Sequence, residues 1–96
     1  TICDALQPTA TKPINLAVLS GRAQPGVTVT DEEVRSAQRF AFANLRLVVE
    51  PGGAAALAAA LAGKVPVDAD TVIMLTGGNA DPAAYAATIA GHDGPV

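Results

Sequence analysis

The stretch TVIMLTGGN, residues 71–79, decides the fold class of this chain. After its leading threonine it runs through four apolar residues, and polar residues bound it on both sides. A continuous apolar run of this length is typical of an interior parallel strand covered on both faces. The turn that follows, with Gly77 and Gly78, lies where open α/β sheets bind ligands, at the carboxyl end of a strand. We therefore expect an α/β domain with parallel strands flanked by helices.

A long helix is predicted upstream of this strand. Thr30 and Glu33 have the spacing of a capping box, in which each side chain covers a free backbone N–H group at the start of a helix. The apolar residues that then recur on one helical face are Val34, Ala37, Ala41, Leu45 and Val48. This periodicity predicts that the helix continues to the end of the apolar series.

Four further segments and a tail complete the expected order of elements. Residues 54–62 are only alanine and leucine, which predicts an apolar helix buried on several sides. Proline at the first helical position and glycine after the last predict helices over 13–21 and 82–90. The β-branched run 27–30 predicts a short strand. Residues 91–96, after the last predicted helix, are expected to form a flexible tail.

Composition excludes several functional classes. The 96 residues carry six Lys and Arg against nine Asp and Glu, a net charge of −3, which disfavours nucleic-acid binding. No apolar run is long enough for a membrane span, and the start lacks a secretory signal pattern. Cys3 is the single cysteine, so a reducing, cytoplasmic location is expected. No metal cluster or catalytic triad can be assembled from the sequence.

Two glycine pairs are candidate binding elements. Gly52 and Gly53 follow Glu50 at the start of a predicted helix, where exposed N–H groups are able to hold an anion. Gly77 and Gly78 allow a ligand to approach the backbone closely. Each pair also has a structural interpretation, as tight helix packing or as an ordinary strand-to-helix turn.

The order and spacing of several motifs indicate a family. The chain resembles the C-terminal third of the threonine/serine dehydratase and serine racemase family of pyridoxal-phosphate enzymes. The motifs that carry this resemblance are TICDA (1–5), PI (13–14), VTVTDEEV (27–34), LVVEPGGA (47–54) and VIMLTGGNAD (72–81). It implies the tryptophan-synthase-like (fold type II) architecture, with residues 1–90 as the C-terminal part of the large catalytic domain.

The resemblance also implies which positions meet the cofactor. Thr76 matches a hydroxyl residue, usually serine, beside the pyridine nitrogen of pyridoxal phosphate. A neutral hydroxyl is able to hydrogen-bond an unprotonated nitrogen, which gives a weak electron sink suited to eliminating water from serine or threonine. Gly77 and Glu50 are expected near the cofactor as well, and Ala5 stands where relatives often have glycine.

Further implications concern nucleotide binding and catalysis. Arg46 and Asn79 match positions that bind nucleotide in some racemase relatives. The family's Schiff-base lysine and phosphate-binding loop precede the matched segment, and neither Lys12 nor Lys64 has that lysine's context. We therefore expect the 96 residues alone to be inactive.

The expected function is that of a fragment of a lyase that deaminates L-threonine or L-serine to a 2-oxo acid and ammonia. The intact enzyme is expected to be a homo-oligomer.

 Serine racemisation is the nearest alternative. A different class remains open: a non-catalytic α/β interaction or anion-binding module that has lost the lysine and the phosphate loop.

Overall fold

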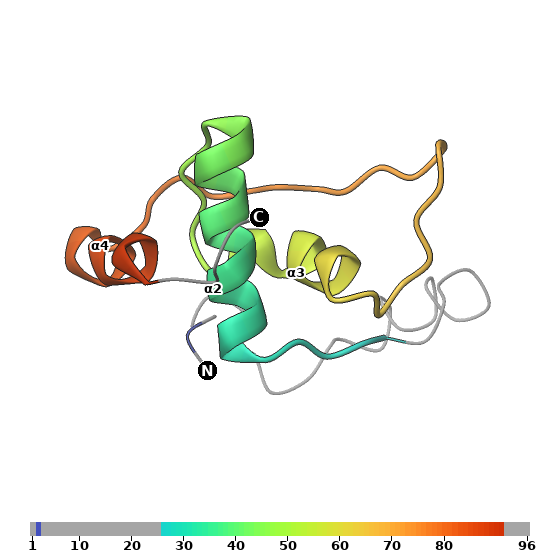
Figure 1. The fold of residues 1–96 in the computed structure, drawn as a ribbon, viewed down its shortest axis with the longest axis horizontal. Helices are drawn as coiled ribbons and strands as arrows, with labels where there is room; N and C mark the ends of the chain where they lie inside the picture. Colours follow the sequence, from blue (N-terminus) through green and yellow to red (C-terminus); the bar gives the residue numbers. More distant parts are fainter. Residues whose placement is uncertain (1, 3–25, 92–96) are drawn as a thin grey trace, which may run out of the picture.

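The computed structural model describes residue 2 and residues 26–91. Within this part the order of elements is α2 (Asp31–Phe40), η2 (Ala41–Leu45), η3 (Gly52–Ala54), α3 (Ala55–Leu61) and α4 (Pro82–Ala90). Helix α2 is central, and α3 and α4 pack against it from opposite sides (Figure 1). The helix expected over 13–21, Ala5 and Cys3 lie outside the described residues.

Helix α2 begins with the predicted capping box. The Thr30 hydroxyl accepts a hydrogen bond from the Glu33 amide at 3.1 Å, and the Glu33 carboxylate accepts one from the Thr30 amide at 2.8 Å. These two bonds satisfy backbone donors that the first helical turn leaves free. The buried face of α2 includes Val34 and Ala37, as the periodicity predicts.

The end of this helix differs from the expectation. The chain passes through a π-helical turn, η2, and then Arg46 adopts a left-handed conformation with φ of 58°. That conformation ends the helix and redirects the backbone. Ala41 is still buried, but Leu45 and Val48 are 45% and 47% exposed, so the predicted apolar face stops short of them.

The alanine-rich segment forms the second wall of the core. Its first turn is the short helix η3, and α3 follows directly. The residues of this segment that are buried are Ala54, Leu57, Ala58 and Ala59, whereas Leu61 is 46% exposed. Burial is therefore confined to one side within the described structure, rather than all round as predicted.

Helix α4 has the predicted limits. The Asp81 carboxylate accepts a hydrogen bond from the Ala84 amide at 2.9 Å, and Pro82 occupies the first turn. Gly91 lies at the C-terminal cap. The edge-to-face contact between Tyr85 and Phe42, with ring centroids 6.3 Å apart, joins α4 to the end of the central helix.

The expectation of parallel strands is not met in the described residues. Residues 27–30 and 71–75 are extended but form no strand ladder there. The physical reason is the hydrogen-bond requirement of a strand, because an extended segment becomes part of a sheet only when a neighbour pairs with its backbone. The described part of the chain is therefore helical, with a long extended connection between α3 and α4 (Figure 1).

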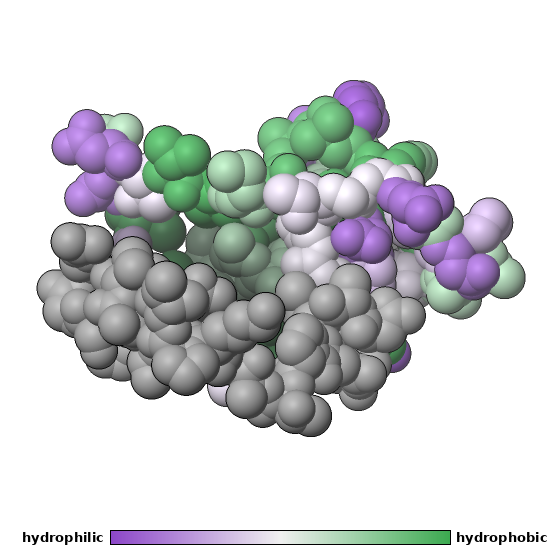
Figure 2. Space-filling model, turned by 180° about the vertical axis from the view of Figure 1, so that it is seen from behind, coloured by the Kyte–Doolittle hydropathy of each residue, from purple (hydrophilic) through white to green (hydrophobic). Residues whose placement is uncertain are grey.

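The extended segment nevertheless has an inner and an outer side. Ile73 and Leu75 pack against the core between α2 and α3, whereas Val72 and Met74 are 88% and 67% exposed. This alternation is that of a strand with one face covered. Exposed apolar side chains gather along one side of the molecule, as Figure 2 shows.

Candidate functional site

Two turns that are far apart in the sequence meet at the end of the extended segment. The Glu50 amide donates a hydrogen bond to the Gly77 carbonyl at 2.6 Å, and the Thr76 amide donates one to the Gly53 carbonyl at 3.3 Å. The contact joins the segment before α3 to the segment before α4. The structure thus brings together Glu50, Thr76 and Gly77, three of the predicted cofactor-binding residues.

Both turns need glycine for this contact. A Cβ atom on Gly53 would overlap the backbone carbonyl of Thr76, and a Cβ atom on Gly77 would overlap the Glu50 carboxylate. Gly77 also has a φ of 75°, a conformation that side chains other than hydrogen disfavour. Gly53 is buried in this contact, so it serves close packing rather than anion binding.

The contact between the two turns, Glu50–Gly53 and Thr76–Gly77, is called the junction below. Thr76 lies at its exposed edge. Its backbone is tied to Gly53, and its Oγ1 atom lies 3.2 Å from the position that a Cβ on Gly53 would take. No hydrogen bond joins its hydroxyl to another described residue. The Thr76 backbone is therefore held against Gly53, while the residue itself is exposed.

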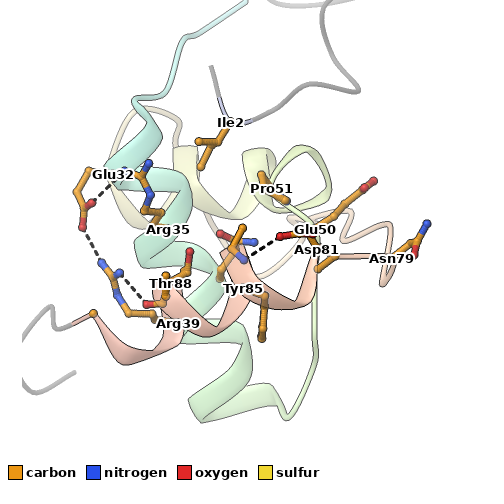
Figure 3. A pocket seen from close by; sticks show the side chains of 15 residues that line it. Ile2, Glu32, Arg35, Arg39, Glu50, Pro51, Asn79, Asp81, Tyr85 and Thr88 are labelled. Atoms are coloured by element: carbon orange, nitrogen blue, oxygen red, sulfur yellow. Dashed lines mark hydrogen bonds and ion pairs between the residues drawn. The ribbon is translucent and has the colours of Figure 1, made fainter.

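A pocket of about 740 Å³ lies beside the junction, between α2 and α4 (Figure 3). Helix α2 contributes Glu32, Arg35, Gln38 and Arg39 to the pocket wall, and α4 contributes Tyr85 and Thr88. Glu50 and Pro51 come from the first turn, and Asn79, Ala80 and Asp81 from the second. Glu50 therefore belongs to both the junction and the pocket.

Arg39 links the two helices that enclose the pocket. Its guanidinium group pairs with the Glu32 carboxylate at 2.7 Å and donates to the Thr88 carbonyl at 3.2 Å. Arg35 pairs with the same carboxylate at 3.5 Å, through a more exposed side chain. The arginines thus differ, because Arg39 is a cross-link and Arg35 is only loosely held.

Two buried polar atoms of the pocket residues have no hydrogen-bond partner within the described structure, Gln38 Oε1 and the Tyr85 hydroxyl. Gln38 is 2% exposed, and its Nε2 donates to the Val49 carbonyl at 2.9 Å. Burial raises the pKa of Tyr85 above its ordinary value. Neither residue was predicted from the sequence, although a glutamine four positions after Val34 on an apolar helical face was an available signal.

Comparison with known proteins identifies the family. Residues 1–77 match the model of the family described as pyridoxal-phosphate dependent enzyme. The chain belongs to this family. It is also 33% identical, over 98 aligned positions that cover all of this chain, to L-threo-3-hydroxyaspartate ammonia-lyase of Saccharomyces cerevisiae. The chain spans 30% of that relative's length. No solved structure matches it.

Because the chain belongs to a pyridoxal-phosphate dependent family, the junction can be compared with the needs of that cofactor. Thr76 has a hydroxyl at its exposed edge, and the missing Cβ atoms of Gly53 and Gly77 allow the two turns to close behind it. These features fit a hydrogen bond from Thr76 to the ring nitrogen of the cofactor. That Thr76, Gly77 and Glu50 hold this end of the family's cofactor stays a prediction, with which their meeting at the junction is consistent.

The other predicted site residues are not all brought to this place. Asn79 lines the pocket next to the junction, but Arg46 does not. Arg46 is exposed, and its guanidinium group donates to the Ala43 carbonyl at 3.2 Å at the end of η2. Arg46 therefore does not line the pocket that Asn79 lines, and the match of both residues to nucleotide-binding positions stays a prediction.

The described residues contain no group of three or more His, Cys, Asp or Glu side chains arranged to hold a metal ion. They also contain no helix that is both long and apolar enough to cross a membrane.

Proposed function

We propose that the protein containing this chain is an ammonia-lyase that deaminates L-threonine or L-serine to a 2-oxo acid and ammonia. Family membership supports pyridoxal-phosphate chemistry. The yeast relative is an ammonia-lyase for an amino acid that carries a 3-hydroxyl group, as serine and threonine do. The observation that carries the proposal is the contact of Gly53 with Thr76, which fixes a hydroxyl at the junction.

The residues of this chain have separate parts in the proposed reaction. Bound pyridoxal phosphate supplies an electron sink for the bonds at the α carbon of the amino acid. The Thr76 hydroxyl donates a hydrogen bond to the ring nitrogen and leaves that nitrogen unprotonated, because a hydroxyl is too weak an acid to transfer its proton. The Glu50 amide and the Gly53 carbonyl position the Thr76–Gly77 turn through the two backbone hydrogen bonds.

The choice of a hydroxyl favours elimination. With Thr76 in place of an acidic residue, bound pyridoxal phosphate would stabilise a negative charge at the α carbon less strongly, because the Thr76 hydroxyl would leave the ring nitrogen unprotonated. A β-hydroxyl that leaves with the electron pair avoids a long-lived charge. The amino acid loses this hydroxyl and its α proton as water, and hydrolysis then releases ammonia and the 2-oxo acid.

Enzyme assays with the complete protein test the proposal. L-Threonine and L-serine are incubated with the cofactor-loaded protein, and the 2-oxo acid and ammonia are measured together. We expect equal amounts of the two products from at least one substrate. Formation of D-serine without ammonia would instead establish racemisation, and an absence of both activities together with an absence of cofactor binding would favour the non-catalytic module.

A further inference from the structure

We propose that the pocket between α2 and α4 binds a small zwitterion of the free α-amino-acid type. The pocket volume of about 740 Å³ lies within the range of small-molecule sites. Thr76 and Gly77 are not among the pocket residues, so this site is separate from the position assigned to the cofactor ring. Its ligand would nevertheless lie next to the junction, because Glu50 belongs to both places.

The charges of the pocket select a ligand with both signs. The described wall carries three acidic side chains, Glu32, Glu50 and Asp81, and two basic ones, Arg35 and Arg39. The arginines lie on the α2 side, and Asp81 lies across the pocket from them (Figure 3). A polyanion would meet a net negative wall, whereas a zwitterion places each of its charges near an opposite one.

Gln38 supplies a fixed acceptor for the positive end. Its Nε2 atom donates to the Val49 carbonyl, which sets the orientation of the amide and leaves Oε1 as the atom without a partner. A buried acceptor without a hydrogen bond is costly. An ammonium group carries three donors and satisfies it.

Arg35 and Tyr85 supply donors for the negative end. The Arg35 side chain is 37% exposed, and its 3.5 Å pair with Glu32 is long enough for a ligand carboxylate to replace. The Tyr85 hydroxyl is buried without a partner, and a carboxylate accepts its hydrogen bond. Arg39 keeps its bonds to Glu32 and Thr88, which join α2 to α4, and forms part of the pocket wall.

Calorimetric titration of the complete protein in its cofactor-free form tests this site. L-Alanine is the probe, because it has no β-hydroxyl to eliminate and cannot react without the cofactor. Propionate and ethylamine are the matched controls, since each carries only one end of the zwitterion. We expect L-alanine to bind at least about tenfold more tightly than either control, which corresponds to one charge-assisted contact.

Variants assign the binding to the pocket. Arg35→Gln, Gln38→Leu and Tyr85→Phe are each expected to weaken L-alanine binding about five- to tenfold. Lys64→Gln removes the same charge outside the pocket and is expected to leave the affinity unchanged. The proposal would be overturned by equal affinities for propionate and L-alanine, by an absence of binding heat, or by an absence of effect in the three variants. Displacement of L-alanine by AMP would also overturn it, because the pocket would then be a nucleotide site. Because no cofactor or turnover is involved, these results are independent of the deamination assays.

Discussion

Gly53 lies directly against the backbone carbonyl of Thr76, at a place where even a methyl group would overlap it. The Thr76 amide completes the contact by donating to the Gly53 carbonyl at 3.3 Å. The contact fixes the end of the extended segment 71–75 against the start of the alanine-rich helix. The position of the Thr76 hydroxyl therefore depends on a residue 23 places earlier in the sequence.

Substitution Gly53→Ala is expected to destabilise the protein by about 1–3 kcal/mol, the usual cost of forcing extra volume into a packed site. Denaturant unfolding measures this change. The matched control is Gly26→Ala, because no atom of the described residues, its chain neighbours aside, lies within 4 Å of the Cβ that it would add. Similar unfolding midpoints for the two variants would contradict the close contact between Gly53 and Thr76.

Loss of the helix cap is a separate prediction. Thr30→Ala removes the hydroxyl that accepts the Glu33 amide and is expected to cost about 1 kcal/mol of stability. Thr28→Ala serves as the control, since within the described part of the chain the Thr28 side chain makes no hydrogen bond and only its backbone carbonyl accepts one, from Lys64. An unchanged unfolding midpoint for Thr30→Ala would count against the capping box.

The pKa of Glu33 gives a prediction for acid pH. The hydrogen bond from Lys64, followed by that from the Thr30 backbone, lowers this pKa below its ordinary value of 4.5. Since the folded pKa is the lower one, the stabilisation is present above pH 4.5 and is lost as pH falls through the folded pKa. NMR titration of the carboxyl group measures the shift directly.

Lys64→Met is expected to raise the pKa of Glu33 back toward 4.5, because the largest cause of its lowering is removed. Arg35→Gln is the control, since Arg35 pairs with Glu32 instead. An equal change in both variants would show that general charge, rather than the 2.6 Å pair of Lys64 with Glu33, sets the pKa.

Local sequence signals predicted the helix starts well. Thr30 with Glu33, and Asp81 with Pro82, are complete capping signals within a few residues, so no distant contact is needed to interpret them. The end of α2 was predicted less well, because the left-handed conformation of Arg46 has no local signature such as glycine. The strand at 71–75 depends on neighbours that the described residues do not supply.

The sequence predicted the segments that contribute to the site, but not that these segments lie together in space. Glu50 and Thr76 could be selected from their motifs, but their meeting is a long-range packing result that no local pattern encodes. The pocket wall was missed for the same reason, since Gln38 and Tyr85 acquire their roles only when α4 lies against α2. Val72 and Met74 are exposed, so a strand covered on both faces, as the apolar run predicts, is not found in the described residues.

Substitutions of Thr76 in the cofactor-loaded complete protein test its role most directly. Thr76→Ser retains the hydroxyl and is expected to keep most of the deaminase activity. Thr76→Ala is expected to lower kcat by one to two orders of magnitude, about 1.4–2.7 kcal/mol of transition-state stabilisation. Thr76→Asp places a carboxylate beside the ring nitrogen, which should then hold a proton, shift the cofactor absorbance and favour side reactions over elimination.

A purely structural role for Thr76 predicts a different pattern. Because its backbone amide makes the contact with Gly53, all three substitutions would preserve that bond, and serine and alanine would have similar small effects. Turnover and cofactor absorbance measured for the three variants separate these two roles. Wild-type activity in Thr76→Ala would remove the residue from the site, whereas loss in alanine, retention in serine and a spectral shift in aspartate together require a hydroxyl at the ring nitrogen.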